Sequence, residues 1–180
     1  MISKKINQNH PKFNQAWEIY QEAFPEDEKR TIKGQLIAFE QPNYSFCCVV
    51  NECEVLGIVA YWQILEYMFV EHFAVKNELR GQGIGAKILR NLFDKYPKFK
   101  FILEADLPID DTSKKRIKFY ESVGFNVNEY EYVQPPYGAT KKPVPMKILT
   151  YPEKINDKSF EEIKQGIYEV VYLCKKKGNC

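Results

Sequence analysis

The sequence predicts a mixed α/β fold in which helices flank a largely antiparallel central sheet. Three runs rich in β-branched and aromatic residues follow one another between residues 44 and 75, with no helical pattern between them. Helical patterns precede these runs and then alternate with further strand patterns up to residue 151. A parallel doubly wound sheet would instead alternate strands and helices throughout.

Length and composition indicate a folded chain of ordinary type. The 180 residues suffice for one domain with its own core, and 44% hydrophobic with 28% charged residues argues against disorder. A net charge of +2 is too small for a nucleic-acid-binding surface. No apolar run is long enough to span a membrane, and residues 1–13 lack the apolar core of a secretory signal. We expect a cytoplasmic monomer or homodimer without nucleic-acid or membrane partners.

The five cysteines and two histidines show no metal-binding pattern. No Cys-x-x-Cys pair occurs, and His10 and His72 are far apart in the sequence. We expect reduced thiols, with Cys47 and Cys48 as small core residues, and no bound metal.

The first half of the chain contains two predicted helices and three predicted strands. Aromatic residues recur at helical spacing in residues 13–24, and a second, short helix is expected in residues 31–39. The segments 44–50 and 54–64 are apolar and close in sequence, which favours an antiparallel hairpin. Residues 66–75 are expected to form a third, adjacent strand.

The second half alternates helices and strands. The expected elements are a helix in 84–96, a strand in 98–106, a helix through 114–124, strands in 128–133 and 144–151, and a helix in 159–175. Residues 110–113 offer several N-caps for the second of these helices, and Ser159 with Glu162 forms a capping box for the last. A Pro-rich loop, residues 134–143, joins the last two strands.

The stretch ELRGQGIGAKILRNLF, residues 78–93, places three glycines at alternate positions just before a helical pattern. A helix N-terminus carries unpaired N–H groups and a partial positive charge, and glycines let an anion approach that backbone closely. A tight turn without a ligand would account for one glycine, or two. Three glycines behind Arg80 favour a phosphate-binding loop.

Two other phosphate-binding motifs fit this stretch less well. A Walker A loop is excluded because Gly85 is followed by Ala86 and Lys87 instead of Lys and Ser or Thr. GQGIGA satisfies the loose dinucleotide fingerprint, with Glu104 and Asp106 roughly 20 residues further on. However, KNELR separates the strand from the glycines, and the hairpin upstream indicates an antiparallel sheet. A nicotinamide-dependent oxidoreductase is therefore disfavoured.

Arg80, Gly83 and Gly85 fill the pattern Arg/Gln-x-x-Gly-x-Gly/Ala, and the stretch resembles the acetyl-CoA loop of the GCN5-related N-acetyltransferase (GNAT) family. EHFAVKNELRGQGIGAKIL resembles the strand, pyrophosphate loop and helix of that family. FYESVGF, residues 119–125, resembles its closing FYE-x-x-GF segment. The resemblance covers about residues 13–150. It implies the GNAT fold in a single domain over residues 1–180, with residues 159–175 as a helical extension.

The resemblance also implies acetyl-CoA as the acetyl donor and assigns residues to it. The residues expected to bind it are Phe73, Ala74, Val75, Arg80, Gly81, Gln82, Gly83, Ile84, Gly85, Ala86 and Ser113. Ser113 stands where many members have asparagine, and Arg116 where many have alanine; a contact between Ser113 and the pantetheine arm is expected on this basis alone.

Two residues are candidates for proton transfer. Tyr120 falls where the family places a tyrosine facing the coenzyme sulfur, and a phenol of pKa about 10 can protonate a thiolate of about 8.5. The alternative is an aromatic side chain packed on the sheet. Glu71 stands where some members keep a base for the amine. In the alternative interpretation, Glu71 is a solvated carboxylate on one face of a half-exposed strand.

The predicted function is acetyl transfer to a primary amine, directly and in a ternary complex. The acceptor is a small amine or a peptide. An acidic, aromatic rim suited to a cationic amine is formed, in this interpretation, by Glu66, Glu71, Glu104, Trp62, Tyr67, Tyr130, Tyr132 and Tyr137. Alternatively, these residues are ordinary surface residues without a binding role. The alternative function is a non-catalytic acyl-CoA-binding module.

Overall fold

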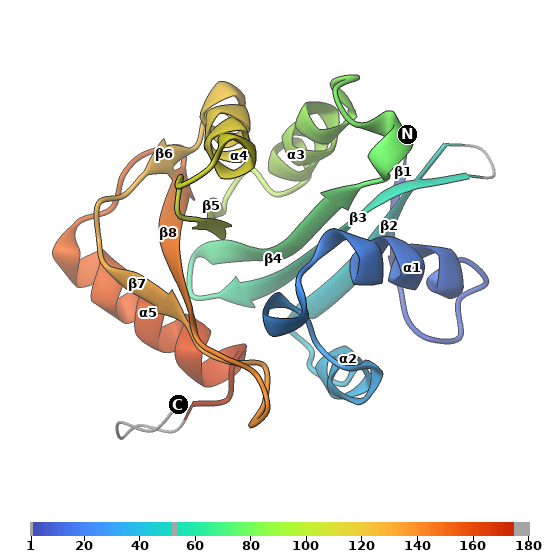
Figure 1. The fold of residues 1–180 in the computed structure, drawn as a ribbon, viewed down its shortest axis with the longest axis horizontal. Helices are drawn as coiled ribbons and strands as arrows, with labels where there is room; N and C mark the ends of the chain where they lie inside the picture. Colours follow the sequence, from blue (N-terminus) through green and yellow to red (C-terminus); the bar gives the residue numbers. More distant parts are fainter. Residues whose placement is uncertain (1, 52–53, 175–180) are drawn as a thin grey trace. The chain divides into compact units, whose positions relative to one another are not determined.

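The computed structural model describes residues 2–51 and 54–174 (Figure 1). The chain forms two compact units. The first contains the residues up to Trp62 together with Val70–Tyr96, and the second contains Gln63–Phe69 and the residues from Pro97 onwards. The predicted fold class, a mixed α/β structure with a mostly antiparallel sheet and flanking helices, is confirmed. The single domain over residues 1–180 stays a prediction.

The first unit contains strands β1 and β2, most of β3 and β4, and helices α1, α2 and α3. In the strand order β1-β2-β3-β4, the pairs β1–β2 and β2–β3 are antiparallel. The strands are β1 (Ile2–Ile6), β2 (Tyr44–Asn51), β3 (Glu54–Ile64) and β4 (Tyr67–Val75). The helices are α1 (Phe13–Ala23), α2 (Ile32–Phe39) and α3 (Ile84–Lys95). Strand β1 was not predicted.

The backbones of β3 and β4 approach closely near the end of β4. A Cβ atom on Gly57 would lie 2.4 Å from the carbonyl oxygen of Ala74. The N–H of Lys76 donates to the carbonyl of Leu56 at 3.0 Å. Since only glycine fits this approach, Gly57 lets β3 lie close against the end of β4, the strand that precedes the glycine-rich loop.

The second unit is built around β8 (Val144–Tyr151). Strand β5 (Lys100–Asp106) pairs with β8 antiparallel. Two short strands, β6 (Asn126–Val127) and β7 (Tyr132–Gln134), also pair antiparallel with β8. The helices of this unit are α4 (Asp111–Val123) and α5 (Asp157–Val170).

Two local predictions in the second unit are wrong. Of the strand expected in residues 128–133, only Tyr132 and Val133 are extended, as part of β7, and β6 ends before it. The side chain of Asn128 bonds to β8 at this point: its Nδ2 donates to the carbonyl of Ile148 and to Thr150 Oγ1. The predicted cap of α5 is also wrong. Asn156 caps this helix, accepting from the N–H of Ser159 at 2.9 Å.

The described cysteines differ in their bonding, and the described helices differ from a membrane span in length or polarity. Cys47 and Cys48 are buried and unbridged, as expected of core residues, and burial raises the pKa of both thiols. Cys174 is disulfide-bonded, so the expectation of reduced thiols is wrong for this residue. Within the described residues, every helix is too short or too polar to cross a membrane.

Candidate active site

The glycine-rich loop has the backbone that its sequence predicts. Gly81 and Gly83 have φ values of 76° and 74°, in the left-handed region that favours glycine. Gly83 is the N-cap of α3 and has no side chain that could bond to the first turn of the helix. The N–H groups of Ile84, Gly85 and Ala86 therefore lie at an uncapped helix start with its partial positive charge. This is the geometry of an anion-binding loop.

The loop is held to the strand and to the core from two sides. Nε of Arg80 donates to the carbonyl of Val75 at 3.2 Å, which ties the loop to the end of β4. Leu79 and Ile84 pack against a buried cluster of Val49, Val75 and Ile88. Arg80, Gly81, Gln82 and Gly83 are exposed. The loop is thus anchored to the core, while its backbone and the guanidinium of Arg80 are accessible to solvent.

The three β4 residues predicted to bind pantetheine differ in their surroundings. Phe73 is half-buried, whereas Ala74 and Val75 are buried. The carbonyl of Ala74 faces Gly57 of β3, and that of Val75 accepts from Arg80. Two of the three carbonyls thus face protein groups.

Glu71 is buried in a hydrogen-bonded ion pair. Its carboxylate bonds to Nη1 of Arg30 and accepts from Nε1 of Trp62 at 2.9 Å. The side chain of Glu71 is 0% exposed, so the alternative of a solvated carboxylate is wrong. The guanidinium of Arg30 lies 5.5 Å from the ring centre of Trp62 and 5.8 Å from that of Tyr44. Burial raises the pKa of Glu71, but Arg30 and His72 outweigh it and hold the pKa well below its usual range.

The same cluster joins β4 to the segment between α1 and α2. Nε2 of His72 lies 3.0 Å from the carbonyl of Glu28, and since a carbonyl only accepts, this nitrogen carries a proton. The N–H of Arg30 donates to the hydroxyl of Tyr20 at 2.6 Å. Nδ1 of His72 lies 3.5 Å from Glu71 Oε2. The sequence pattern does not single out Arg30, which lies in a charged run that looks like ordinary surface.

Tyr120 and Ser113 lie in α4 of the second unit. Tyr120 is 8% exposed and packs against Phe125, with ring centres 5.7 Å apart. Burial raises the pKa of Tyr120 to about 12; Arg116 lowers it and Asp106 raises it. The hydroxyl therefore stays protonated at every physiological pH.

Ser113 forms the capping box of α4. Its N–H donates to Oδ1 of Asp110 at 2.8 Å, and its Oγ accepts from the N–H of Asp110 at 3.1 Å. The Oγ hydroxyl also lies within bonding distance of Asp110 oxygens. The cap thus engages this hydroxyl, and the predicted contact with pantetheine has no support in this geometry.

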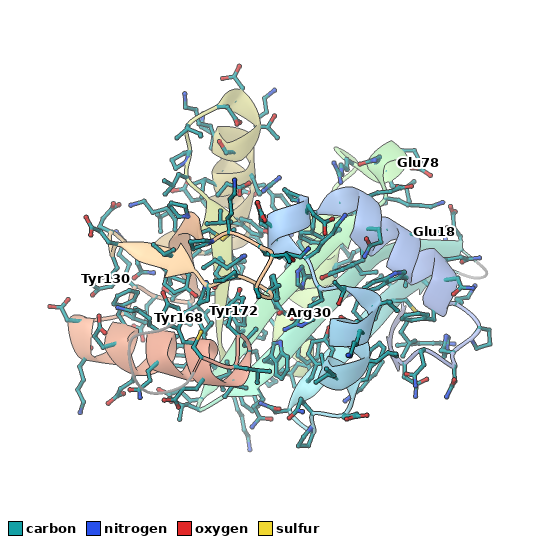
Figure 2. The ribbon with its side chains drawn as sticks, turned by 60° about the horizontal axis from the view of Figure 1, so that its bottom comes forward. Glu18, Arg30, Glu78, Tyr130, Tyr168 and Tyr172 are labelled. Atoms are coloured by element: carbon teal, nitrogen blue, oxygen red, sulfur yellow. The ribbon has the colours of Figure 1, made fainter. Side chains whose placement is uncertain are left out.

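A second polar cluster lies in the second unit. The hydroxyls of Tyr132 and Tyr172 donate to Oε1 and Oε2 of Glu104, the second at 2.7 Å. The ring of Tyr137 lies 4.9 Å from that of Tyr172. Tyr168 donates to the carbonyl of Val133 at 2.5 Å. Figure 2 labels Tyr168 and Tyr172 beside the reddish helix α5.

The residues of the predicted acidic, aromatic rim belong to both units and have different surroundings. Glu71 and Trp62 bond to each other inside the first unit. Tyr130 stacks on Phe160 and donates to the carbonyl of Ile155 at 3.0 Å, and Tyr67 is 2% exposed. Glu104, Tyr132 and Tyr137 are the members that the second polar cluster contains.

The first unit also has an acidic cavity of about 560 Å³ between α1 and the ends of β3 and β4. The polar residues that line it include Glu18, Glu22, Glu54, Lys76 and Glu78, of which Figure 2 labels Glu18 and Glu78. Lys76 is paired with both Glu54 and Glu78. This surface therefore does not suit a pyrophosphate.

Among residues 2–51 and 54–174, no three His, Cys, Asp or Glu side chains are grouped as metal ligands.

The comparisons with known proteins agree with this geometry. The sequence model of the acetyltransferase (GNAT) family matches residues 13–125, more than half of the chain. A solved structure from Bacteroides thetaiotaomicron, described as a GNAT-family acetyltransferase, is 27% identical with a TM-score of 0.90. That match covers 97% of this chain and 100% of the other. A comparison with curated proteins found no significant match.

More distant structures share the fold. An aminoglycoside 6′-N-acetyltransferase complexed with coenzyme A matches with a TM-score of 0.62 at 17% identity, over 87% of this chain and 100% of that one. A GNAT-family acetyltransferase from Elizabethkingia anophelis with acetyl-CoA bound has a TM-score of 0.57 at 15% identity, over 83% and 95%. With the family match over residues 13–125 and the loop geometry at Gly81 and Gly83, the chain belongs to the GNAT acetyltransferase family.

Proposed function

We propose that this protein is an acetyl-CoA-dependent N-acetyltransferase that transfers the acetyl group directly to a primary amine. The observation that carries the proposal is the loop at the start of α3. Two left-handed glycines, an uncapped helix N-terminus and Arg80 form a cradle for a pyrophosphate. Two structures with the same fold hold coenzyme A or acetyl-CoA, which supports this choice of ligand.

The proposed reaction takes place in a ternary complex. The neutral amine attacks the thioester carbonyl, so that a C–N bond forms and the C–S bond breaks. The sulfur leaves as a thiolate that needs a proton, and the nitrogen gives up one. An alkylamine has a pKa of about 10.4, so most of it is protonated at neutral pH and must first lose a proton.

Tyr120 is the proposed proton donor to the thiolate. Its raised pKa keeps the phenol protonated, so the proton is present when the sulfur leaves. The same burial makes it a weaker acid than a free tyrosine, against a thiol of pKa about 8.5. We therefore assign it a hydrogen bond to the developing thiolate, with proton transfer completed as the negative charge on sulfur grows.

Glu71 as the base stays a prediction. Two features count against direct proton transfer to its carboxylate. Its side chain is enclosed, and Arg30 makes it a weak base by lowering its pKa. A base works best with a pKa near the operating pH. Removal of the amine proton by water is the alternative for this step.

Calorimetric titration with acetyl-CoA tests the proposal first. We expect saturable binding of one equivalent, and then thiol release with a panel of primary amines that includes small amines and peptides. No binding at high micromolar acetyl-CoA would refute the proposed function. Binding without thiol release across the panel would identify a non-catalytic acyl-CoA-binding module instead.

A further inference from the structure

Gln134 carries a buried donor that pairs with none of the described residues. The residue is 3% exposed, and its Nε2 has no hydrogen-bond partner among the described residues. Leaving a buried N–H unpaired is costly, and native structures rarely contain such a group without a reason. An acceptor oxygen supplied by a ligand would satisfy it.

The strand register places Gln134 on the same face as the second polar cluster. Glu104 of β5 is paired with Ile148 of β8, and on the other edge of β8 Tyr132 is paired with Met146 and Gln134 with Val144. Paired residues of antiparallel strands share a face, and so do alternate residues along one strand. Glu104, Tyr132 and Gln134 therefore share one face of the sheet.

The carboxylate of Glu104 is held in a fixed orientation on that face. Tyr132 donates to one of its oxygens and Tyr172 to the other, and each carboxylate oxygen can accept a further bond. The rings of Tyr172 and Tyr137 lie together beside it, at 4.9 Å. A carboxylate beside aromatic rings is suited to an alkylammonium group.

Resting on the proposed function, we propose that Glu104 and Gln134 form the acceptor subsite and select an amine with a carbonyl group on its α-carbon. Glu104 binds the ammonium form and Nε2 of Gln134 donates to the carbonyl oxygen. The ligand class is the α-amino amide, either a free amino-acid amide or the first residue of a peptide. A simple polyamine carries nitrogen donors only and leaves Nε2 unpaired.

The other face of the same strand lies on the side of α4, which carries Tyr120. Phe101 of β5 and Tyr151 of β8 are paired, and Tyr151 contacts Phe125, which packs on Tyr120 of α4. Phe101 and Glu104 are an odd number of positions apart, so α4 and the acceptor subsite lie on opposite faces of β5. The residues proposed to bind the acceptor and the proposed proton donor thus reach β5 from opposite faces.

The test uses two amines of similar shape as substrates, each with the wild-type protein and with the Gln134→Leu variant. L-alaninamide carries the carboxamide, and 2-amino-3-methylbutane replaces it with an isopropyl group. The measured quantity is the ratio of kcat/KM for the two amines, from thiol release at one pH, so that the different amine pKa values cancel between proteins. We expect this ratio to fall by about 10- to 100-fold in Gln134→Leu, the usual effect of losing one buried hydrogen bond to substrate. Gln165→Leu, an exposed change on α5, should leave the ratio unchanged.

The outcomes separate this inference from the proposed function. Gln134→Leu should keep the unfolding temperature of the wild type, because Nε2 bonds to none of the residues that the structure describes. An unchanged ratio in this folded variant overturns the subsite, and so does thiol release with other amines but not with α-amino amides. Absence of thiol release with every amine overturns the proposed function itself. The tripeptide Ala-Gly-Gly identifies the source: a higher kcat/KM than for alaninamide assigns the subsite to peptide N-termini, and an equal or lower one to free amides.

Discussion

Arg30 and Glu71 form an ion pair that solvent hardly reaches, with side-chain exposures of 6% and 0%. Arg30 belongs to the segment between α1 and α2, and Glu71 to the middle of β4. The pair therefore fastens a connecting segment to the strand that leads into the glycine-rich loop.

Replacing Arg30 by methionine should destabilise the protein by about 3 to 5 kcal/mol, the usual cost of removing one partner of a buried pair. The loss arises because the charge of Glu71 stays buried with Trp62 as a remaining donor. Urea denaturation of the variant gives the value. Arg90→Met, an exposed change on α3, is the control and should cost less than about 0.5 kcal/mol. Equal stability of the two variants would show that the pair contributes little.

Stability should also fall in acid because of Glu71. Arg30 and His72 outweigh burial and lower its folded pKa below the ordinary 4.5. A carboxylate with a lowered folded pKa adds stability that is present above its unfolded pKa and is lost as the pH falls towards the folded one. The difference in unfolding free energy between wild type and Glu71→Gln should shrink below about pH 4.5. A difference that is constant from pH 7 to pH 3 would contradict this account.

Gly83→Val should weaken acetyl-CoA binding severely while the chain still folds. A Cβ at Gly83 meets nothing within 4 Å, so the change adds backbone strain at φ 74° and a side chain over the proposed pyrophosphate site. Titration calorimetry measures the affinity. Gly138→Val is the matched control, since Gly138 also has a positive φ, 147°, and open space around it. Similar losses of affinity in both variants, or none in either, would exclude the loop as the binding site.

Tyr120→Phe should lower kcat by about 10²- to 10⁴-fold, the usual worth of a positioned acid. The ring is kept, so acetyl-CoA affinity and stability should change little. Because the pKa of Tyr120 is raised to about 12, the wild-type rate should show no alkaline loss from this group below about pH 11. Stopped-flow or steady-state thiol release measures both quantities, with Tyr130→Phe as the control. Near wild-type kcat in Tyr120→Phe would make Tyr120 a packing residue.

The pH dependence of Glu71→Gln decides what Glu71 does. A base that takes up the amine proton would give a 10²- to 10⁴-fold loss at neutral pH that alkaline buffer largely restores, since free amine is then abundant. A purely structural role of Glu71 in its buried pair with Arg30 would instead give a smaller loss, by the same factor at every pH. Steady-state rates from pH 6 to pH 10 separate the two. Recovery in alkaline buffer would identify Glu71 as the base.

Elements with strong local patterns were predictable from the sequence. The glycine-rich loop and α3 were predicted because glycines at alternate positions and an apolar face at helical spacing are local signals. Strand β1 was missed because ISKKI is short and mostly polar, and its pairing with β2 depends on residues 40 or more positions away. The strand expected in residues 128–133 was misjudged because its alternating pattern does not reveal the bonds of Asn128.

Side-chain contacts across long sequence separations could not be predicted. Nothing near Arg30 distinguishes it from the charged residues around it, and its burial depends on Glu71. Glu71 looked like a half-exposed strand residue because alternation along β4 says nothing of the segment that covers it. The partnership of Glu104 with Tyr172 likewise comes from the packing of α5 and the residues after it.

The 68 positions between Glu104 and Tyr172 also bear on how the protein is made. A ribosome adds residues in order at about 5 to 20 per second, so Glu104 is present for several seconds before Tyr172 is added. Tyr132 is added 28 positions after Glu104, and the carboxylate lacks its second tyrosine donor until the segment after α5 emerges and docks. A nascent chain that already contains the glycine-rich loop and α4 therefore still lacks a finished carboxylate cluster.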